Sequence, residues 1–346
     1  MNKLHTSFQI LEILSTSGSG SVYKAWHKGL QKNVVIKKLK NTGNYDAEIM
    51  RNEVEALKNI KSPFVPQVLD FLTDSSVSYT IIEFIEGESL DKHIMRGEKF
   101  KPEQVLKWYY QLACALEAIH KSKVCHRDIK PANIILSSSG DVCLIDFDVA
   151  YVTGKGMKRY SRSLGYASPE QLAVFRQNLR IPGVCAPLSL KIPHLIDWKR
   201  SDIYSLGATM LHLLTGVNPL DTCGDRFSGI GAHAVSAPPE GVGFAPPDAD
   251  AKRPHRRNSF DASPVGADTG GQDALRQCRL FDIIEKSMRY VPTQRYGSAV
   301  ALKSALRAEA KSYHTRQNLR LLHRGGRHRY PGRYFQAARR ELTCYP

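Results

Sequence analysis

The first quarter of the chain alternates between short apolar segments and polar turns. Residues 8–14, 22–27 and 33–39 are rich in aliphatic, aromatic and β-branched side chains, which favours strands over helices. Two further apolar segments, 64–72 and 77–84, have the same character. The pattern predicts a small antiparallel sheet near the N-terminus.

Two longer segments have the three-to-four spacing of an amphipathic helix. One covers residues 46–60 and the other residues 102–121. The stripe of the second helix comprises Val105, Tyr109, Leu112, Leu116 and Ile119. We expect this helix to be part of the structural scaffold and to contribute no catalytic side chains.

A hairpin is predicted where residues 133–136 and 142–145 flank the turn sequence Ser-Ser-Ser-Gly-Asp. A hairpin brings its two ends together, so Asn133 and Asp146 should converge on one point. Two oxygen ligands with open positions beside them suit Mg²⁺, which keeps waters and takes further ligands from phosphates. Asp128 would lie beside that metal as a candidate base for a hydroxyl. A polar surface hairpin is the plainer alternative.

The residues around this hairpin resemble the catalytic loop and metal-binding motif of the eukaryotic-type protein kinases. Residues 126–133 read His-Arg-Asp-Ile-Lys-Pro-Ala-Asn, similar to H-R-D-x-K-x-x-N, and Asp146-Phe-Asp148 stands where the family has D-F-G. The resemblance implies that Asp128 orients and deprotonates a hydroxyl and that Lys130 stabilises the moving phosphoryl group. Asn133 and Asp146 would hold Mg²⁺, with Mn²⁺ as a further possibility. Asp148 departs from the family glycine.

The N-terminal segments resemble the ATP-binding half of the same family. Residues 15–22 resemble its glycine-rich loop, although only Gly20 falls on a family glycine. Val34-Val-Ile-Lys37 resembles V-A-I-K, and Glu53 looks like the helix glutamate that holds the lysine on the phosphates. Ile82 would be the gatekeeper. The resemblance assigns nucleotide contacts to Leu14, Gly20, Val22, Val35, Lys37, Glu53, Glu83, Ile85 and Ile135. Ordinary core packing would explain the apolar members equally.

Residues 149–170 resemble a short activation segment that ends in Ser168-Pro-Glu170. By that match Ser163 is the residue that contacts the catalytic Asp and Lys. A phosphate on this segment, at Tyr160 or a neighbouring serine, would pair with Arg127. A basic solvated loop is the alternative.

The resemblance implies structural roles for three further residues. Asp202 would anchor the backbone of the catalytic loop, and Arg295 would pair with Glu170. His126 is expected to pack against Phe147 as a core histidine.

Composition is that of an ordinary soluble globular protein, with 42% hydrophobic and 24% charged residues among 346. No run approaches 18 apolar residues, and the first residues lack the apolar core of a signal peptide. The seven scattered cysteines favour reduced thiols, hence a cytoplasmic protein. The net charge of +16 is concentrated after residue 310, where an arginine-rich tail with aromatics could bind nucleic acid or an anionic membrane surface. A solvated basic tail is the alternative.

The sequence therefore predicts an α+β, two-lobed protein-kinase-like fold. An ATP-binding lobe would span residues 1–85 and a catalytic lobe residues 86–310, with insertions at about 172–199 and 222–272 before a tail at 311–346. The expected activity is transfer of the ATP γ-phosphoryl group to Ser or Thr hydroxyls of protein substrates, including the chain itself.

Two alternatives remain open at this point. Asp148 and the missing loop glycines favour a pseudokinase, a nucleotide-binding or scaffolding module with little turnover. The other alternative is a kinase fold that acts on a small molecule. Lys130 and the Ser168-Pro-Glu170 motif favour a protein substrate instead.

Overall fold

The computed structural model describes seven stretches of the chain: residues 6–17, 20–40, 54–73, 77–153, 163–178, 196–220 and 279–324. Several predicted features lie outside them. They are Glu53, the candidate phosphate acceptor Tyr160, the insertion at 222–272 and most of the tail.

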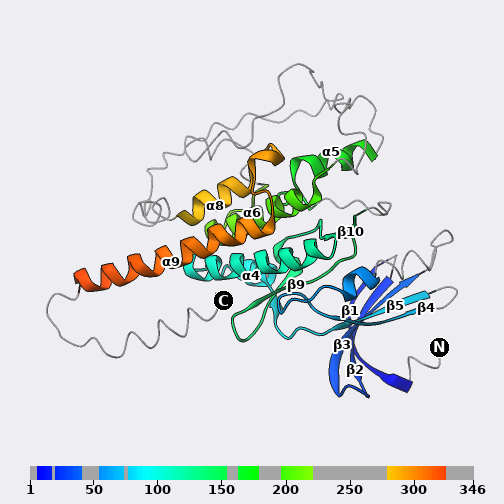
Figure 1. Ribbon diagram of the computed structural model, residues 1–346. Coiled ribbons are helices and arrows are strands. Elements are labelled where there is room, and N and C mark those ends of the chain that lie inside the picture. The colour runs from blue at the N-terminus through cyan, green and yellow to red at the C-terminus, as the bar shows by residue number, and fades with distance from the viewer. Residues whose placement is uncertain are drawn as a thin grey trace, which may run out of the picture.

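The N-terminal lobe is a five-stranded antiparallel sheet in the order β1-β2-β3-β5-β4 (Figure 1). Its strands are β1 (Phe8–Ser17), β2 (Gly20–His27), β3 (Lys32–Lys40), β4 (Val68–Thr73) and β5 (Val77–Glu83). One face of the sheet buries Phe8, Ala25, Val34, Ile36 and Ile81. The predicted sheet is therefore confirmed.

One strand begins later than its composition predicts. The apolar segment that starts at residue 64 enters the sheet only at Val68. Pro63 and Pro66 lie in the turn and irregular backbone before it. Proline has no N–H to donate to a sheet, so a strand is disfavoured across these positions. Of the predicted helix at 46–60, residues 54–60 are described; residues 54–58 are helical, whereas Asn59 lies in a turn and Ile60 is outside the helix, so the helix ends two residues earlier than predicted.

The C-terminal lobe is mainly helical (Figure 1). Its helices are α3 (Leu90–Met95), α4 (Pro102–Lys121), α5 (Pro169–Asn178), α6 (Trp198–Thr215), α8 (Arg279–Ser287) and α9 (Ala299–Arg324), with 3₁₀ turns at Pro131–Asn133 and Pro292–Gln294. Short strands β6 (Glu88–Ser89), β8 (Ile134–Leu136) and β9 (Val142–Leu144) form one small sheet, and β7 (Val124–Cys125) pairs with β10 (Tyr151–Val152). The two-lobed fold matches the prediction.

Helices α4 and α6 form the centre of this lobe. The bounds of α4 agree with the predicted helix, and all five residues of its predicted stripe are fully buried. Helix α6 buries Ile203, Leu206 and Met210 completely and ends at Gly216, which has φ 70°. A left-handed glycine at this position is a common way to terminate a helix. These helices give the neighbouring loops a rigid base.

Three predicted boundaries, at residues 172, 199 and 310, fall inside helices. Helix α5 covers the first part of the predicted insertion at 172–199, and α6 begins before that insertion ends. Helix α9 runs past residue 310 to Arg324, and Tyr313 on it donates a hydrogen bond to Glu103 on α4 at 3.0 Å. The chain offers no glycine or proline to stop this helix until Gly325. Among the helices of the described stretches, none has the length and apolar character needed to cross a membrane.

Candidate functional site

The loop between β7 and β8 is held by one buried carboxylate. Asp202 on α6, fully buried, accepts hydrogen bonds from the backbone N–H groups of His126 at 2.9 Å and Arg127 at 2.8 Å. His120 on α4 contacts the same carboxylate at 2.9 Å. Arg127 has φ 68°, a strained value for a residue with a Cβ. Two hydrogen bonds to a charged acceptor offset such strain, so Asp202 fixes the loop as predicted.

His126 packs in the interior between the loop and the segment after β9. Its ring lies 4.7 Å from that of Phe147, centroid to centroid, and its Nε2 contacts the carbonyl of Ile145 at 3.0 Å. Burial lowers the pKa of His126, which favours the neutral ring. The neutral ring donates from Nε2, and its Nδ1 can accept the N–H of Asp128 at 3.3 Å. The expected packing role of His126 and Phe147 is confirmed.

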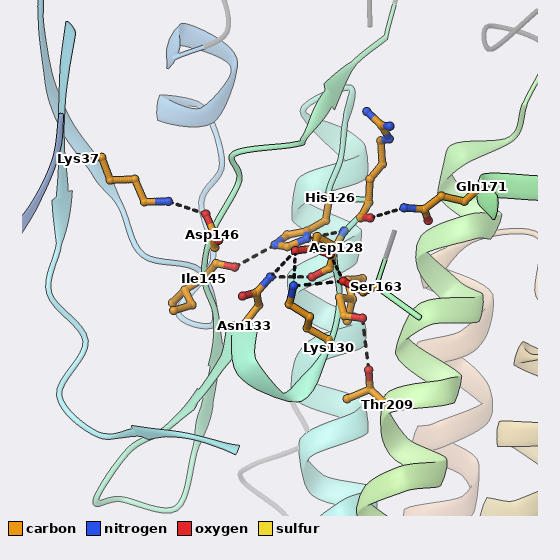
Figure 2. Close-up of polar contacts among 12 residues, drawn as sticks. Lys37, His126, Asp128, Lys130, Asn133, Ile145, Asp146, Ser163, Gln171 and Thr209 are labelled. Carbon is orange, nitrogen blue, oxygen red and sulfur yellow. Dashed lines mark hydrogen bonds and ion pairs between the residues drawn. The ribbon is translucent and has the colours of Figure 1, made fainter. Parts of the chain in front are cut away.

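Asp128 is the centre of a hydrogen-bonded cluster of four side chains (Figure 2). Lys130 Nζ donates to its Oδ2 at 2.8 Å, and Ser163 Oγ donates to its Oδ1 at 2.5 Å. Lys130 Nζ also contacts Ser163 Oγ at 3.1 Å. Asn133 Nδ2 donates to the carbonyl of Asp128 at 2.8 Å and to its Oδ2 at 3.0 Å. The contacts expected of Ser163 are therefore present.

Asp146 lies on the side of this cluster that faces the sheet, and it meets Lys37 from β3 (Figure 2). Lys37 Nζ is 2.5 Å from Asp146 Oδ1 and 2.8 Å from Asp148 Oδ1. Burial alone would lower the pKa of Lys37, but the carboxylates of Asp148 and Asp146 outweigh it and raise that pKa. Burial would likewise raise the pKa of Asp146, and the Lys37 ammonium outweighs it and lowers that pKa. The ammonium of Lys37 and the carboxylate of Asp146 therefore stabilise each other in their charged forms.

The open end of the β8–β9 hairpin brings Asn133 and Asp146 together. The N–H of Ile145 donates to the carbonyl of Asn133 at 2.9 Å, so the residues on either side of this bond are neighbours. Because Asn133 Nδ2 is directed at Asp128, its Oδ1 is the atom of the amide that can ligate a cation. The amide oxygen of Asn133 and the neighbouring carboxylate of Asp146 form a donor set that suits a hard divalent cation. The residues fit the predicted metal.

The residues expected around the nucleotide share the face of the sheet opposite its core. Val22 is paired with Lys37 across β2 and β3, and Val35 is paired with Ile82 across β3 and β5. Directly opposed residues point to the same face, as do Val35 and Lys37 two positions apart. The alternate residues Val34 and Ile36 are fully buried on the other face.

The remaining predicted nucleotide contacts lie within strands, at their ends or directly after them. Leu14 lies at an irregularity of β1 and is 43% exposed, whereas Ile135 is paired with Cys143 in the β8–β9 hairpin. Glu83 ends β5, and Ile85 follows it. At Gly20 a Cβ would lie 2.1 Å from the carbonyl oxygen of Lys38, so the contact between β2 and β3 itself requires glycine there.

Arg127 and Trp198 form a contact that the sequence did not indicate. The guanidinium of Arg127 lies 4.6 Å from the centre of the Trp198 ring and donates to the carbonyl of Val149 at 3.0 Å. Gln171 on α5 donates to the carbonyl of Arg127 at 2.6 Å. Trp198 fell within a predicted insertion and Gln171 lies outside the quoted motifs, so no pattern in the sequence pointed to either of these partners of Arg127. They connect the catalytic loop to α5 and α6.

A buried ion pair joins α5 to the segment after α8. Arg295 donates to both carboxylate oxygens of Glu170, at 2.6 and 2.9 Å, as the family resemblance implies. Arg295 also donates to the backbone carbonyls of Arg200, Arg289 and Tyr290. This pair stabilises the end of the activation segment against the core of the lobe.

Comparison with known proteins gives a family for this arrangement. A family model described as "Protein kinase domain" matches residues 8–306. A probable serine/threonine-protein kinase of Clostridium perfringens is 29% identical over 225 residues, which cover 63% of this chain and 30% of that protein. The serine/threonine-protein kinase PrkC of Bacillus subtilis is 29% identical over 221 residues, 62% of this chain and 31% of PrkC.

A human relative shows the same degree of similarity. Serine/threonine-protein kinase 32B of Homo sapiens is 28% identical over 220 residues, 62% of this chain and 49% of the human protein. The matched part thus spans about a third to a half of the length of these curated relatives.

Proposed function

Because the chain belongs to the protein kinase domain family, we propose that it transfers the γ-phosphoryl group of ATP to Ser or Thr hydroxyls of protein substrates, its own chain among them. The observation that carries this proposal is the cluster of Asp128, Lys130, Asn133 and Ser163 beside the Lys37–Asp146 pair. It joins a candidate base, cationic groups and oxygen ligands. Relatives named as serine/threonine-protein kinases support a protein substrate over a small molecule.

In the proposed reaction the substrate hydroxyl oxygen forms a bond to the γ-phosphorus. The bond from that phosphorus to the oxygen bridging to the β-phosphate breaks, and its electron pair leaves with ADP. Asp128 orients the hydroxyl and accepts its proton, and the Lys130 ammonium, 2.8 Å from Asp128, neutralises charge on the transferred group. Catalysis of this kind consists mostly of positioning and electrostatic stabilisation.

The proposed cofactor is Mg²⁺, with Mn²⁺ as the alternative, held by Asn133 Oδ1 and the carboxylate of Asp146. When bound, such an ion neutralises negative charge on the phosphates. Lys37 would bind the phosphates, and Glu53 is the helix residue expected to form an ion pair with it. We propose nucleotide contacts for Leu14, Gly20, Val22, Val35, Glu83, Ile85 and Ile135. The sheet register supports Val22 and Val35, and the end of β5 supports Glu83 and Ile85.

The test is incorporation of radiolabel from [γ-³²P]ATP with Mg²⁺ into the chain and a generic Ser/Thr substrate. Asp128→Asn keeps the shape of the side chain but removes the base, so we expect the rate to fall at least about a hundredfold. Asp282→Asn is the matched control, because Asp282 is exposed on α8. Equal incorporation by wild type and Asp128→Asn would overturn the proposal. ATP binding without turnover in the wild type would favour a pseudokinase.

The cysteines and the basic tail support two further proposals, one about the location of the protein and one about its partners. Cys114, Cys125 and Cys143, within the described residues, are free thiols, which supports a reducing compartment and hence the cytoplasm. Cell fractionation would check that location. We also propose that the basic tail contacts polyanions, for which its arginines are the support.

A further inference from the structure

The third residue of the Asp146-Phe-Asp148 motif adopts a conformation that does not need glycine. Among the described non-glycine residues, positive φ angles occur at Gln31, Lys123, Arg127 and Asp146. Asp148 is not one of them. An aspartate therefore fits here without the strain of a left-handed backbone conformation. Its side chain is available for an interaction that glycine could not make.

The Asp148 carboxylate is directed at Lys37. The distance from Lys37 Nζ to Asp148 Oδ1 is 2.8 Å, and the same ammonium is 2.5 Å from Asp146 Oδ1. The side chain of Lys37 is 15% exposed, and that of Asp148 is 41% exposed. An ammonium has three N–H donors, so it can bind both carboxylates and still donate to a third acceptor.

The backbone on both sides of Asp148 is fixed to the catalytic loop. The N–H of Ala150 donates to the carbonyl of Phe147 at 3.0 Å, which closes a turn around Asp148. Phe147 packs on His126, and the carbonyl of Val149 accepts from Arg127. The carboxylate is thus held at the end of a short, rigid turn, so little conformational entropy is lost when it binds Lys37.

The charges of the three groups do not balance. One ammonium faces two carboxylates, which leaves one negative charge, and a divalent cation on Asp146 would more than compensate it. Asp146 is also the proposed metal ligand, so an ion there would compete with Lys37 for its oxygen. Asp148 is the second carboxylate within hydrogen-bonding distance of Lys37. Asp148 can therefore hold the Lys37 ammonium in place while Asp146 binds the metal ion.

We propose that Asp148 is a positioning residue that holds Lys37 against the nucleotide phosphates. The inference rests on the proposed function in one respect, the assignment of Lys37 to the phosphates. The Asp148 carboxylate orients Lys37, which a glycine at the same position could not do. It also connects Lys37 to the catalytic loop through the turn at 147–150.

The test is a double-mutant cycle on nucleotide affinity, measured by calorimetry with ADP and ATP in the presence of Mg²⁺ on the full chain. Asp148→Asn should weaken nucleotide binding by about fivefold, the effect of one partly exposed ion pair. Asp148→Gly should weaken it to the same extent because it also removes the carboxylate. In a Lys37→Ala background, neither change should weaken binding further, since the ammonium they orient is absent.

Asp141→Asn is the matched control. Asp141 lies in the turn of the β8–β9 hairpin and forms an ion pair with Lys107 at 2.9 Å. Its side chain is 45% exposed, close to the 41% of Asp148. It should leave nucleotide affinity unchanged. The proposal is overturned if Asp148→Asn binds nucleotide as tightly as the wild type or more tightly, or if it weakens binding equally with and without Lys37.

A kinetic measurement separates this inference from the proposed function. If phosphoryl transfer occurs, Asp148→Asn should raise the KM for ATP by more than it lowers kcat. If the wild type binds nucleotide but transfers no phosphoryl group, the proposed function fails. Coupling between Asp148 and Lys37 in the binding cycle would still support the role of Asp148.

Discussion

The hydroxyl of Ser163 joins the two charged groups of the catalytic loop. It donates to Asp128 at 2.5 Å and contacts Lys130 Nζ at 3.1 Å, so it fixes the distance between the candidate base and the cation. A rotatable acid and a long lysine side chain would otherwise sample several arrangements. Ser163 thereby reduces the number of positions that the two groups can take before a substrate arrives.

Replacement of Ser163 by alanine should lower kcat roughly tenfold and leave the KM for ATP near its wild-type value. A hydrogen bond to a charged group contributes about 1.5 kcal/mol, and about 1.4 kcal/mol corresponds to a factor of ten in rate. Steady-state kinetics with saturating protein substrate measures both constants. Ser163→Thr keeps the hydroxyl and should retain activity. An unchanged kcat in Ser163→Ala would show that the contact does not position Asp128.

Between elements, the Glu170–Arg295 pair connects α5 with the segment that precedes α9. The side chain of Arg295 is fully buried, and that of Glu170 is 8% exposed. Arg295 also lies 4.9 Å from the ring centre of Tyr204 on α6. The pair therefore joins three helical regions, and its removal should loosen the packing beneath the activation segment.

Glu170→Ala should lower the free energy of unfolding by about 3–5 kcal/mol, because it leaves a buried guanidinium without its carboxylate. Urea denaturation followed by circular dichroism measures this loss. The double variant with Arg295→Met should lose less than the sum of the two single variants.

The control for this prediction is the partly exposed pair of Lys303 and Glu117, which joins α9 to α4. Glu117→Gln there should cost no more than about 1 kcal/mol. Equal losses at both pairs would contradict the view that burial makes the difference.

For the molecule as a whole, the basic C-terminal residues follow the part of the sequence that matches the kinase family. The family match ends at residue 306, and the last residue with an assigned role is Arg295. Residues 325–346 contain five arginines and one glutamate, a net charge of +4. Charge of this kind attracts polyanions over a distance of about 10 Å at moderate salt.

A chain that ends after Arg324 should keep its rate of phosphoryl transfer and elute from a heparin column at lower salt than the full chain. The full-length chain with the five arginines replaced by glutamine should elute like the truncated one, because charge and not length is responsible. Unchanged retention in both would remove the tail as a polyanion contact. Loss of activity in the truncated chain alone would mean that the last residues support the fold.

Much of this architecture is visible in local patterns. The stripe on α4 predicts its bounds and its buried face because one turn of helix repeats every 3.6 residues. The turn between β8 and β9 predicts that Asn133 and Asp146 converge, because a hairpin closes on itself. The roles of Asp202 and Arg295 came from resemblance, and the structure confirms the contacts expected of both.

Other contacts depend on how distant parts of the chain pack. Lys37 is separated by 109 and 111 residues from the two aspartates that bind it. The local sequence of β3 does not predict which carboxylates will pair with this lysine. Trp198 meets Arg127 because α6 underlies the catalytic loop. Periodicity describes the faces of single elements, whereas the partners of a charged side chain follow from the packing of whole elements against each other. For Asp148 the sequence shows an unusual residue in a known motif, and the folded chain shows that its carboxylate binds Lys37.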